Sequence, residues 1–410
     1  MASVAYPAVK VLVRFDKGAE NAGWLLGEGG LGAVQLGSPD ADSDYTDISA
    51  YVQSVNVKRG RSRELQRFSP GRCNIRLDNT TRVFDPLFAG GAHYGNLLPG
   101  RRVRVYITHP TGGADHRVFT GQVTDWGLSY SSGAKNATTT LSATDRMVDL
   151  QRVEISKTTT AGTSNIAVNE ILNAGGIVSR SIDTGDETFQ ATAFAAVTCL
   201  SAMQTAEDSE QGAMYVDVDN AVVWKSRNSI FSDSASNTSQ ATLGTASLPL
   251  LDVSLDYAAD LIRNDVSLTR TGGSAQTAEN SDSIVAYGKR SYTKTGLMTS
   301  TDAALDAIAD TILIVYKDPR VRVQKIVMAP QSNTNLMTEA LTRKIRDRVT
   351  VQFAPPGGGA VISQDGYISG IEHNLTPGTY TTAFTLESTE GNDVAFVLGI
   401  AKLGTSQLWG

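Results

Sequence analysis

The chain has 410 residues, of which 41% are hydrophobic and 19% charged, and its formal net charge is −6. This composition excludes a chain that is disordered throughout, and the length predicts roughly two to four domains. Cys73 and Cys199 lie far apart, which argues against a disulfide framework or a cysteine metal site. We find no secretory signal and no apolar window long enough for a membrane span, so we expect a protein made in a cytoplasm.

The first third of the chain predicts an all-β unit, which we place at residues 1–150. Apolar residues alternate over 9–15, as in a half-buried strand. An extended Gly- and Asp-rich loop over 16–44 follows, and its length suggests a role of its own. Turn-forming Pro and Gly residues separate the later strands, which we predict at 51–58, 73–77, 103–108, 118–126 and 137–143.

Residues 151–250 are net acidic and predict a small α/β domain. Ser164 is a candidate cap for a helix that ends at Gly175 and Gly176. A second helix is predicted over about 193–207. Asp219-Asn220 lies between two apolar runs and predicts a hairpin, and the Ser- and Asn-rich stretch 232–239 predicts a loop.

The β pattern returns in residues 251–395, which we assign to a second β-barrel. One helix is predicted at 302–316, where Leu305, Ile308 and Ile312 share a face. The strands are predicted at 265–269, 348–353, 366–372 and 381–387, and residues 396–410 form a C-terminal tail. The expected fold class is therefore mainly β with an α/β insertion.

An internal echo relates the first and last thirds of the chain. The run 102–106 recurs as 348–352, and a glycine turn follows each. The other matches keep this order: 112–113 with 357–359, 120–123 with 369–371, and 140–145 with 385–390. Chance similarity between Val-rich strands is the alternative. We favour two antiparallel β-barrels related by internal duplication.

Several short runs stand in a distinctive order over most of the chain. They are Arg59-Gly60-Arg61, Phe84-Asp85-Pro86, Phe119-Thr120-Gly121, and the ranges 71–79, 99–105, 283–290 and 316–319. In this order they resemble minor tail proteins of long-tailed phages that infect actinobacteria. The resemblance implies a baseplate hub, a homotrimer with two tube-like antiparallel β-barrels per subunit and smaller domains beside them. It implies no catalytic residue.

The function implied by this resemblance is structural. The protein would join the sixfold tail tube to the threefold tip, at the tail tip of a virion assembled in the host cytoplasm, and would form part of the DNA channel. Its expected partners are its own copies, the distal tail protein, the tape-measure protein and receptor-binding proteins, with transient, non-specific passage of DNA. Two alternatives stay open: a hexameric distal-tail adaptor, and a tail component that cleaves cell wall or carbohydrate. The chain reaches Gly410 without the hydrolase or fibre domain that some tail-tip proteins carry.

Patterns that could carry chemistry lack their required context. The run 27–32 has the G-x-G-x-x-G spacing, but no helix is predicted after it. Asp40, Asp42 and Asp44 resemble the start of a calcium loop, whose later Gly and Glu are replaced by tyrosines. His93, His109, His116 and His373 show no zinc-site spacing. We therefore expect no enzyme, cofactor or metal site, although an acid/base pair of carboxylates is not recognisable from sequence.

A basic run over residues 58–104 contains many Lys and Arg residues without a stacking pattern of aromatic residues. Arginine is well suited to pairing with carboxylates at interfaces. We predict that these arginines point outward or into contacts with a neighbouring subunit. A DNA channel would then have a neutral to acidic surface, because exposed cations retain DNA through its phosphates.

Overall fold

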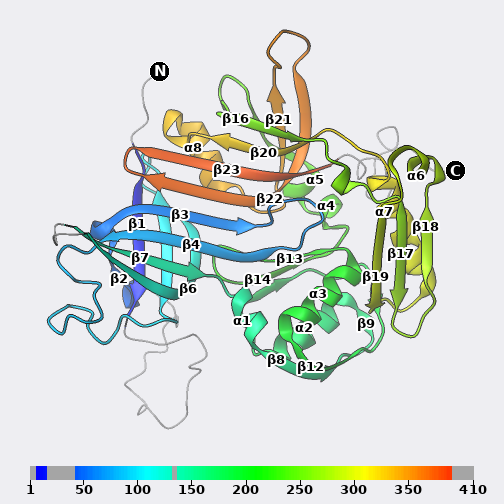
Figure 1. Cartoon of the computed structure of the whole chain (residues 1–410), viewed down its shortest axis with the longest axis horizontal. Helices are drawn as coiled ribbons and strands as arrows, with labels where there is room; N and C mark the ends of the chain where they lie inside the picture. Colours follow the sequence, from blue (N-terminus) through cyan, green and yellow to red (C-terminus); the bar gives the residue numbers. More distant parts are fainter. Residues whose placement is uncertain (1–5, 16–41, 132–135, 390–410) are drawn as a thin grey trace.

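The computed structural model describes residues 6–15, 42–131 and 136–389, and a 13-stranded sheet runs along the molecule (Figure 1). Its N-terminal strands are β1 (Ala8–Arg14), β2 (Thr46–Asp47), β3 (Val52–Gly60), β4 (Ser69–Asp78), β5 (Arg102–Thr108), β6 (Asp115–Tyr130) and β7 (Ala137–Thr144). Its C-terminal strands are β15 (Ser239–Leu243), β16 (Asp252–Asp256), β20 (Arg322–Met328), β21 (Arg348–Phe353), β22 (Ile362–Thr376) and β23 (Thr379–Ser388). The expected mainly β fold class is confirmed.

The sheet consists of two halves with the same strand order. The first half-sheet has the order β1-β5-β6-β7-β4-β3, and the second has the order β15-β21-β22-β23-β20-β16. The strands also follow the same order along the chain: β1, β3, β4, β5, β6 and β7 correspond to β15, β16, β20, β21, β22 and β23. One difference is that β1 pairs antiparallel with β5, whereas β15 pairs parallel with β21. The two halves therefore share a topology, as a duplication predicts.

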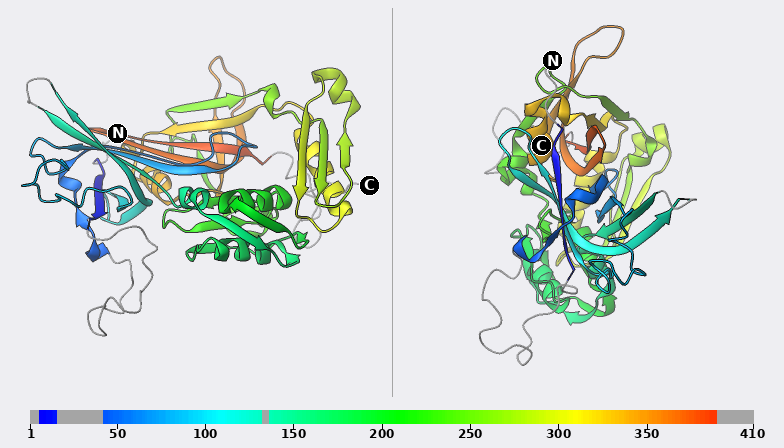
Figure 2. Two further views of the ribbon diagram at one scale, coloured as in Figure 1. Left: turned by 60° about the horizontal axis from the view of Figure 1, so that its bottom comes forward. Right: turned by 90° about the vertical axis from the view of Figure 1, so that its left-hand side faces the viewer.

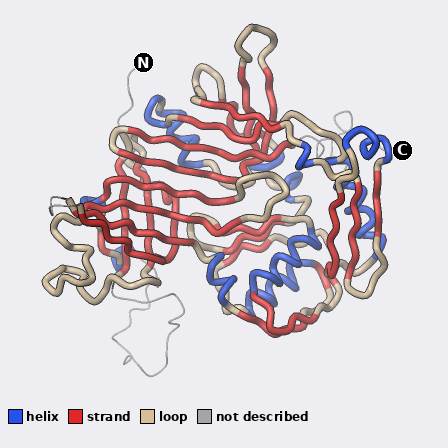
Figure 3. Tube along the Cα trace, viewed as in Figure 1, coloured by secondary structure: helices blue, strands red, loops and turns tan. Residues whose placement is uncertain are grey.

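Residue alternation explains why one side of the sheet is buried. In β4, Cys73, Ile75 and Leu77 are buried, whereas the residues between them are exposed. The buried side chains of each half form a large core cluster of their own. In the first half the sheet folds back over this core, so that β1 runs across β3 and β4 in Figure 1 and the crossed strands are seen at the left of Figure 3.

A β-bulge lies at the equivalent place in both halves. The ladder between β6 and β7 shifts between Val123 and Asp125, and the ladder between β22 and β23 shifts between Ile368 and Gly370. This register makes Gly121 equivalent to Gly366.

Part of the sequence alignment is corrected by this register. In the internal alignment of the first and last thirds, the match of 120–123 with 369–371 lies four residues too far along the chain. The match of 140–145 with 385–390 lies two residues too far along. Even shifts keep every side chain on its face, so the apolar pattern does not reveal them. The match of 102–106 with 348–352 agrees with the ladders.

An α/β unit lies between the two half-sheets in sequence and below the large sheet in Figure 2. Its helices are α1 (Met147–Arg152), α2 (Ser164–Ala174), α3 (Cys199–Glu210), α4 (Ser229–Ser232) and α5 (Ser234–Asn237). Its strands are β8 (Glu154–Thr158), β9 (Gly162–Thr163), β10 (Arg180–Ile182), β11 (Thr188–Phe189), β12 (Ala193–Thr198), β13 (Ala213–Val216) and β14 (Val222–Lys225).

Two predictions for this unit are wrong in part. The helix predicted from 193 starts at Cys199, because residues before it form β12, which pairs with β8. Thr198 caps α3 by accepting a hydrogen bond from the Ser201 amide at 3.1 Å. The stretch 232–239 is not a loop throughout, since it contains the end of α4, the whole of α5 and the start of β15. The predicted hairpin around Asp219 is present as β13 and β14.

A second insertion separates β16 from β20 and has its own core cluster. It contains β17 (Asp265–Arg270), β18 (Gln276–Glu279), β19 (Ser291–Leu297), α6 (Ser281–Tyr287) and α7 (Asp302–Tyr316), the helix predicted at 302–316. A further helix, α8 (Thr334–Thr342), precedes β21, so 251–395 contains more than the one helix expected. Short 3-10 helices complete the elements: η1 (Asp42–Asp44), η2 (Ser49–Tyr51), η3 (Ala259–Leu261) and η4 (Pro330–Ser332).

Candidate assembly surfaces

The two half-sheets meet at a seam, the antiparallel ladder that pairs Val55 to Gly60 of β3 with Leu375 to Gly370 of β22. Gly60 has a φ of +94°, and a Cβ at this position would lie 2.2 Å from the Ser369 carbonyl oxygen. A side chain is therefore excluded by both conformation and space. The core also crosses the seam, because Leu375 belongs to the cluster of the first half-sheet.

The loop between β3 and β4, residues 61–68, links three other parts of the chain. Its ion pairs are Arg61 with Glu387, Arg63 with Asp256 (2.9 Å) and Asp260 (2.7 Å), Glu64 with Arg322 (3.5 Å), and Arg67 with Asp208 (2.6 Å). The Tyr316 hydroxyl donates to Glu64 at 2.9 Å. These partners lie in the second half-sheet, the two insertions and their junctions. The prediction that arginines of this run pair with a neighbouring subunit is thus wrong for Arg61, Arg63 and Arg67, which pair within the chain.

Two sheet edges repeat the geometry of the seam without a partner strand. Among the described residues, β16 pairs with β20 on one side and with no strand on the other. From Asp125 to Tyr130, β6 pairs with β7 and, within the described part of the chain, with no strand on its opposite side. These edges are the counterparts of β3 and β22. They also carry exposed apolar side chains, namely Leu255 at 46% exposure and Tyr130 at 53%.

The face of the sheet opposite the core is polar. One row of cross-strand neighbours contains Asp125, Ser142, Asn74, Asn56, Asn374 and Thr381, all at least partly exposed. The face carries cations, including Lys58, Arg72 and Arg76, and anions that include Asp252 and Glu372. Lys325 lies 3.5 Å from Glu372. Most of the basic run 58–104 lies elsewhere, and the only charge in the row itself is that of Asp125 among hydroxyl and amide groups.

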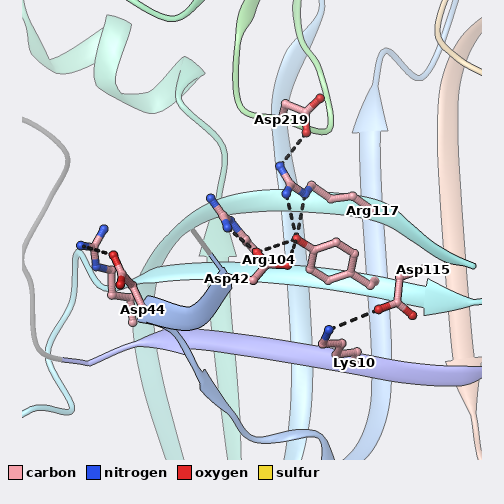
Figure 4. A network of polar contacts seen from close by, with 9 residues as sticks. Lys10, Asp42, Asp44, Arg104, Asp115, Arg117 and Asp219 are labelled. Atoms are coloured by element: carbon pink, nitrogen blue, oxygen red, sulfur yellow. Dashed lines mark hydrogen bonds and ion pairs between the residues drawn. The ribbon is translucent and has the colours of Figure 1, made fainter. Parts of the chain in front are cut away.

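Figure 4 shows a network on the outer side of β1, β5 and β6. Asp42 accepts hydrogen bonds from Arg104 and from the Tyr106 hydroxyl at 3.0 Å. Burial raises the pKa of Asp42, but these two hydrogen bonds outweigh burial and lower the pKa below its usual value. Arg117 donates to the Tyr106 hydroxyl at 2.8 Å and pairs with Asp219 at 2.6 Å, which ties β6 to the α/β unit.

This network decides the chemistry of the acidic residues singled out in the sequence. Asp44 pairs with Arg14 at 3.3 Å, so Asp42 and Asp44 neutralise arginines rather than converging on a cation. Asp40 and the glycine run 27–32 lie outside the described residues. Among the residues described, no group of His, Cys, Asp and Glu could hold a metal ion.

The histidines and cysteines lie in separate surroundings. His93 stacks on Phe15, and the Nδ1 atom of His373 lies 3.0 Å from the Tyr380 hydroxyl. His109 and His116 are neighbours, with ring centroids 6.5 Å apart. Cys73 and Cys199 are free and buried, and burial raises the pKa of both thiols. None of these contacts forms a nucleophile and base pair.

Two buried carboxyl groups were missed by the sequence analysis. Burial raises the pKa of Asp145 to about 7 and that of Glu207 to about 7. Asp145 accepts from the Gly71 amide at 2.7 Å, and Glu207 from the Met214 amide at 3.1 Å. Asp145 therefore holds the backbone of β4 just after β7 ends, and Glu207 holds β13 against α3 inside the α/β unit. No pattern marks them, because acidic residues are common throughout the chain.

Comparison with solved structures shows the fold of phage tail proteins. The 43 kDa tail protein of prophage MuSo2 from Shewanella oneidensis is 13% identical, with a TM-score of 0.57 over 94% of this chain and 98% of that one. The tail protein from Neisseria meningitidis MC58 is 13% identical, with a TM-score of 0.59 over the same shares. A chain of the Francisella PdpA–VgrG complex is 8% identical, with a TM-score of 0.51 over 94% of this chain and 58% of that chain.

The sequence itself has no match among family models or curated proteins. The likeness is therefore one of fold, and it covers nearly the whole chain. An actinobacterial host stays a hypothesis. In the described ranges, every helix is too short or too polar to cross a bilayer.

Proposed function

We propose that the protein is a structural subunit of a phage tail, the hub at the tail tip, and that it acts as a homotrimer. One observation carries this proposal. A single chain contains two half-sheets of the same strand order, joined edge to edge by the β3–β22 seam. The tail-protein fold agrees with this role.

Repeating the seam between chains produces a closed ring. Within the chain, β3 of the first half-sheet pairs with β22 of the second. Their counterparts, β16 in the second half-sheet and β6 in the first, have free edges within the described ranges, so β16 of one copy can pair with β6 of the next copy in the same way. A closed ring requires that each contact surface meets its counterpart. Three copies supply six half-sheets, which matches a sixfold tube on one side and a threefold tip on the other.

The polar face of the sheet would line the channel of this ring. The hydroxyl and amide groups of its central row suit the passage of DNA, because this row offers no cation to hold phosphates. The partners in this proposal are the distal tail protein, the tape-measure protein and receptor-binding proteins, in a virion assembled in the host cytoplasm. We place the two barrels at about 1–150 and 251–395, with the α/β domain of 151–250 beside them; the second barrel also takes in β15 and is interrupted by the insertion between β16 and β20.

The alternatives are less well supported. A hexameric adaptor needs one half-sheet per chain for a sixfold ring, whereas this chain has two. A cell-wall-cleaving component needs a catalytic constellation, and the sequence contains no recognised nucleophile, metal or elbow motif that would supply one. We therefore propose a protein without enzymatic activity. A particle mass of three times the 43.6 kDa subunit separates the trimer from the hexamer.

Disulfide cross-linking tests the ring. By the register of the seam, Ser129 of one copy lies opposite Ser254 of the next, because Asn374 and Asn56 are the equivalent pair within the chain. The double variant S129C/S254C should form covalent dimers and trimers on oxidation, since directly opposed residues meet disulfide geometry. Non-reducing electrophoresis measures the products.

The controls make the result specific. Both native cysteines are buried, and each single variant should stay uncross-linked. N56C/N374C should close a disulfide inside one chain, which confirms that the method detects the known seam. A double variant that stays monomeric while N56C/N374C closes would contradict the proposed ring.

A further inference from the structure

The seam is reinforced by a helix that reaches from the second half-sheet into the first. The link between β20 and β21, residues 329–347, contains α8. Leu336 of this helix joins the core of its own half-sheet, whereas Met337 and Leu341 join the core of the first. The Thr338 hydroxyl lies 3.3 Å from the Nε2 atom of His109, at the tip of the β5–β6 hairpin. The β20–β21 link thus clamps a hairpin across the seam.

The equivalent segment of the first half-sheet is the β4–β5 link, residues 79–101. Its inner side is anchored in its own half-sheet, where Phe84 and Leu97 are buried. The Asn79 side chain accepts a hydrogen bond from the Phe84 amide at 2.9 Å, which holds this conformation. The link therefore has a defined shape, like α8, although it contains no helix.

The β4–β5 link also carries three large apolar side chains that are exposed. Leu87 is 83% exposed, Tyr94 52% and Leu98 49%. Large apolar side chains that are exposed on one short link suit an interaction site. In the counterpart link, the residues that cross the seam are buried in the other half-sheet.

The counterpart of the clamped hairpin is also uncovered. The β21–β22 hairpin projects from the sheet in Figure 1, and Val361 and Ile362 near its tip are 60% and 37% exposed. Pro355, Pro356 and the glycines at 357–359 form its turn. No residue in the described part of the chain occupies the place that α8 takes on the first hairpin.

We propose that the β4–β5 link of one copy clamps the β21–β22 hairpin of the next copy. The inference rests on the proposed trimer and names a contact that the edge pairing does not require. The correspondence between the two half-sheets also relates α8 to the β4–β5 link. As α8 contacts the β5–β6 hairpin within the chain, the β4–β5 link would contact the β21–β22 hairpin of the next copy. The occupant of the apolar surface is therefore a second copy of this chain, and both exposed surfaces are covered in one step.

Photo-cross-linking of the full chain tests the contact. A benzophenone amino acid at Tyr94 should cross-link to residues 354–363 of a second copy, as mapped by mass spectrometry of the band that contains two copies. The same probe at Tyr287, on α6 in the second insertion, is the control and should not reach these residues. Tyr287 is 41% exposed, so both sites accept the probe.

A substitution measures how much the contact contributes. Leu87→Asp should raise the concentration needed for half-trimerisation by about tenfold or more, because it places a charge in an apolar anchor. Val178→Asp is the matched control, because Val178 is 87% exposed on the α/β unit, and it should leave trimerisation unchanged.

The outcomes separate this contact from the proposed function. A trimer with cross-links from Tyr94 to 354–363 supports both. A trimer that cross-links elsewhere, or that is indifferent to Leu87→Asp, overturns the clamp and leaves the hub proposal in place. A chain that stays monomeric in the S129C/S254C experiment overturns both.

Discussion

Charged side chains are buried where the first half-sheet, the second half-sheet and the two insertions meet. Glu64 and Arg322 are 8% and 4% exposed and lie 3.5 Å apart, and the Tyr316 hydroxyl completes the group. A buried ion pair contributes little net stability, but losing one partner is costly because the other charge stays buried. Such groups define which parts of the chain meet here, which suits a subunit whose parts must keep fixed positions in an assembly.

Glu207 makes stability depend on pH. Burial raises its pKa to about 7, above that of the unfolded chain. The folded protein therefore holds this proton more tightly, and the stabilisation is complete below about pH 4.5 and is lost as pH rises through about 7. Glu207→Gln keeps an acceptor for the Met214 amide and stays neutral. Between pH 5 and pH 8, the free energy of unfolding of this variant should fall less steeply than that of the wild type. The difference in slope should be roughly 1 kcal/mol per pH unit.

Chemical denaturation of the variant and the wild type across this range is the measurement. Burial lowers the pKa of His373 to about 3. The stability that depends on neutral His373 is lost as pH falls below about 6.5, so His373 changes stability with pH in the opposite direction to Glu207. Both proteins retain His373, so the difference between them isolates Glu207. Glu279→Gln, at an exposed site on β18, should keep the wild-type slope. Identical slopes for all three proteins would refute the assignment.

At the scale of elements, bulges and one glycine set the register of the sheet. The bulges in β6 and β22 occur at equivalent places, where the strand ends its pairing with β5 or β21. Beyond the bulge β22 pairs with β3, whereas β6 has no second neighbour in the described part of the chain. The N-terminal part of β22 pairs with β21, and its C-terminal part pairs with β3 on the same side. The long strand β22 therefore forms part of the second half-sheet and also forms the seam with the first.

Gly60 should be the least replaceable glycine of the seam. Gly60→Ala places a Cβ 2.2 Å from the Ser369 carbonyl oxygen at a φ of +94°, so we expect a loss of about 2–4 kcal/mol. Gly378 has a φ of +78° in the β22–β23 turn with open space around it. Gly378→Ala should therefore cost about 1 kcal/mol. Thermal or urea unfolding of both variants measures the difference, and equal losses would show that crowding at the seam is unimportant.

At the scale of the whole molecule, the polar face predicts weak retention of DNA. We expect the assembled protein to bind duplex DNA more weakly than about 10⁻⁴ M at physiological salt, the weak end of non-specific binding. Lysines introduced at Asn74 and Asn374 in the central row of this face should create binding that declines steeply with salt. Electrophoretic mobility shift at several salt concentrations measures both. Tight binding by the unchanged protein would argue against a passage surface.

The sequence alone predicted the elements whose patterns are local. Strand patterns identified β1 and β3 to β7 of the first half-sheet and β21 to β23 of the second, and the apolar stripe of 302–316 identified α7. They did not identify β15, β16 and β20, and the strand predicted at 265–269 belongs to a separate sheet. The repeated order of strands and turns led to two related β units, and the half-sheets have the same order. The helix expected from 193 failed locally, because Ala and Val suit both a helix and a strand, and pairing with β8 decides between them.

Only the tertiary structure decided the register and the surfaces. A shift by two or four residues leaves the alternation unchanged, so the bulges and ladders were needed to align the half-sheets. Arg61, Arg63 and Arg67 were expected at another subunit, but their carboxylate partners are 141 to 326 residues away in the same chain. The exposed edges of β6 and β16 are equally non-local, because an edge exists only once every other strand has found its neighbour.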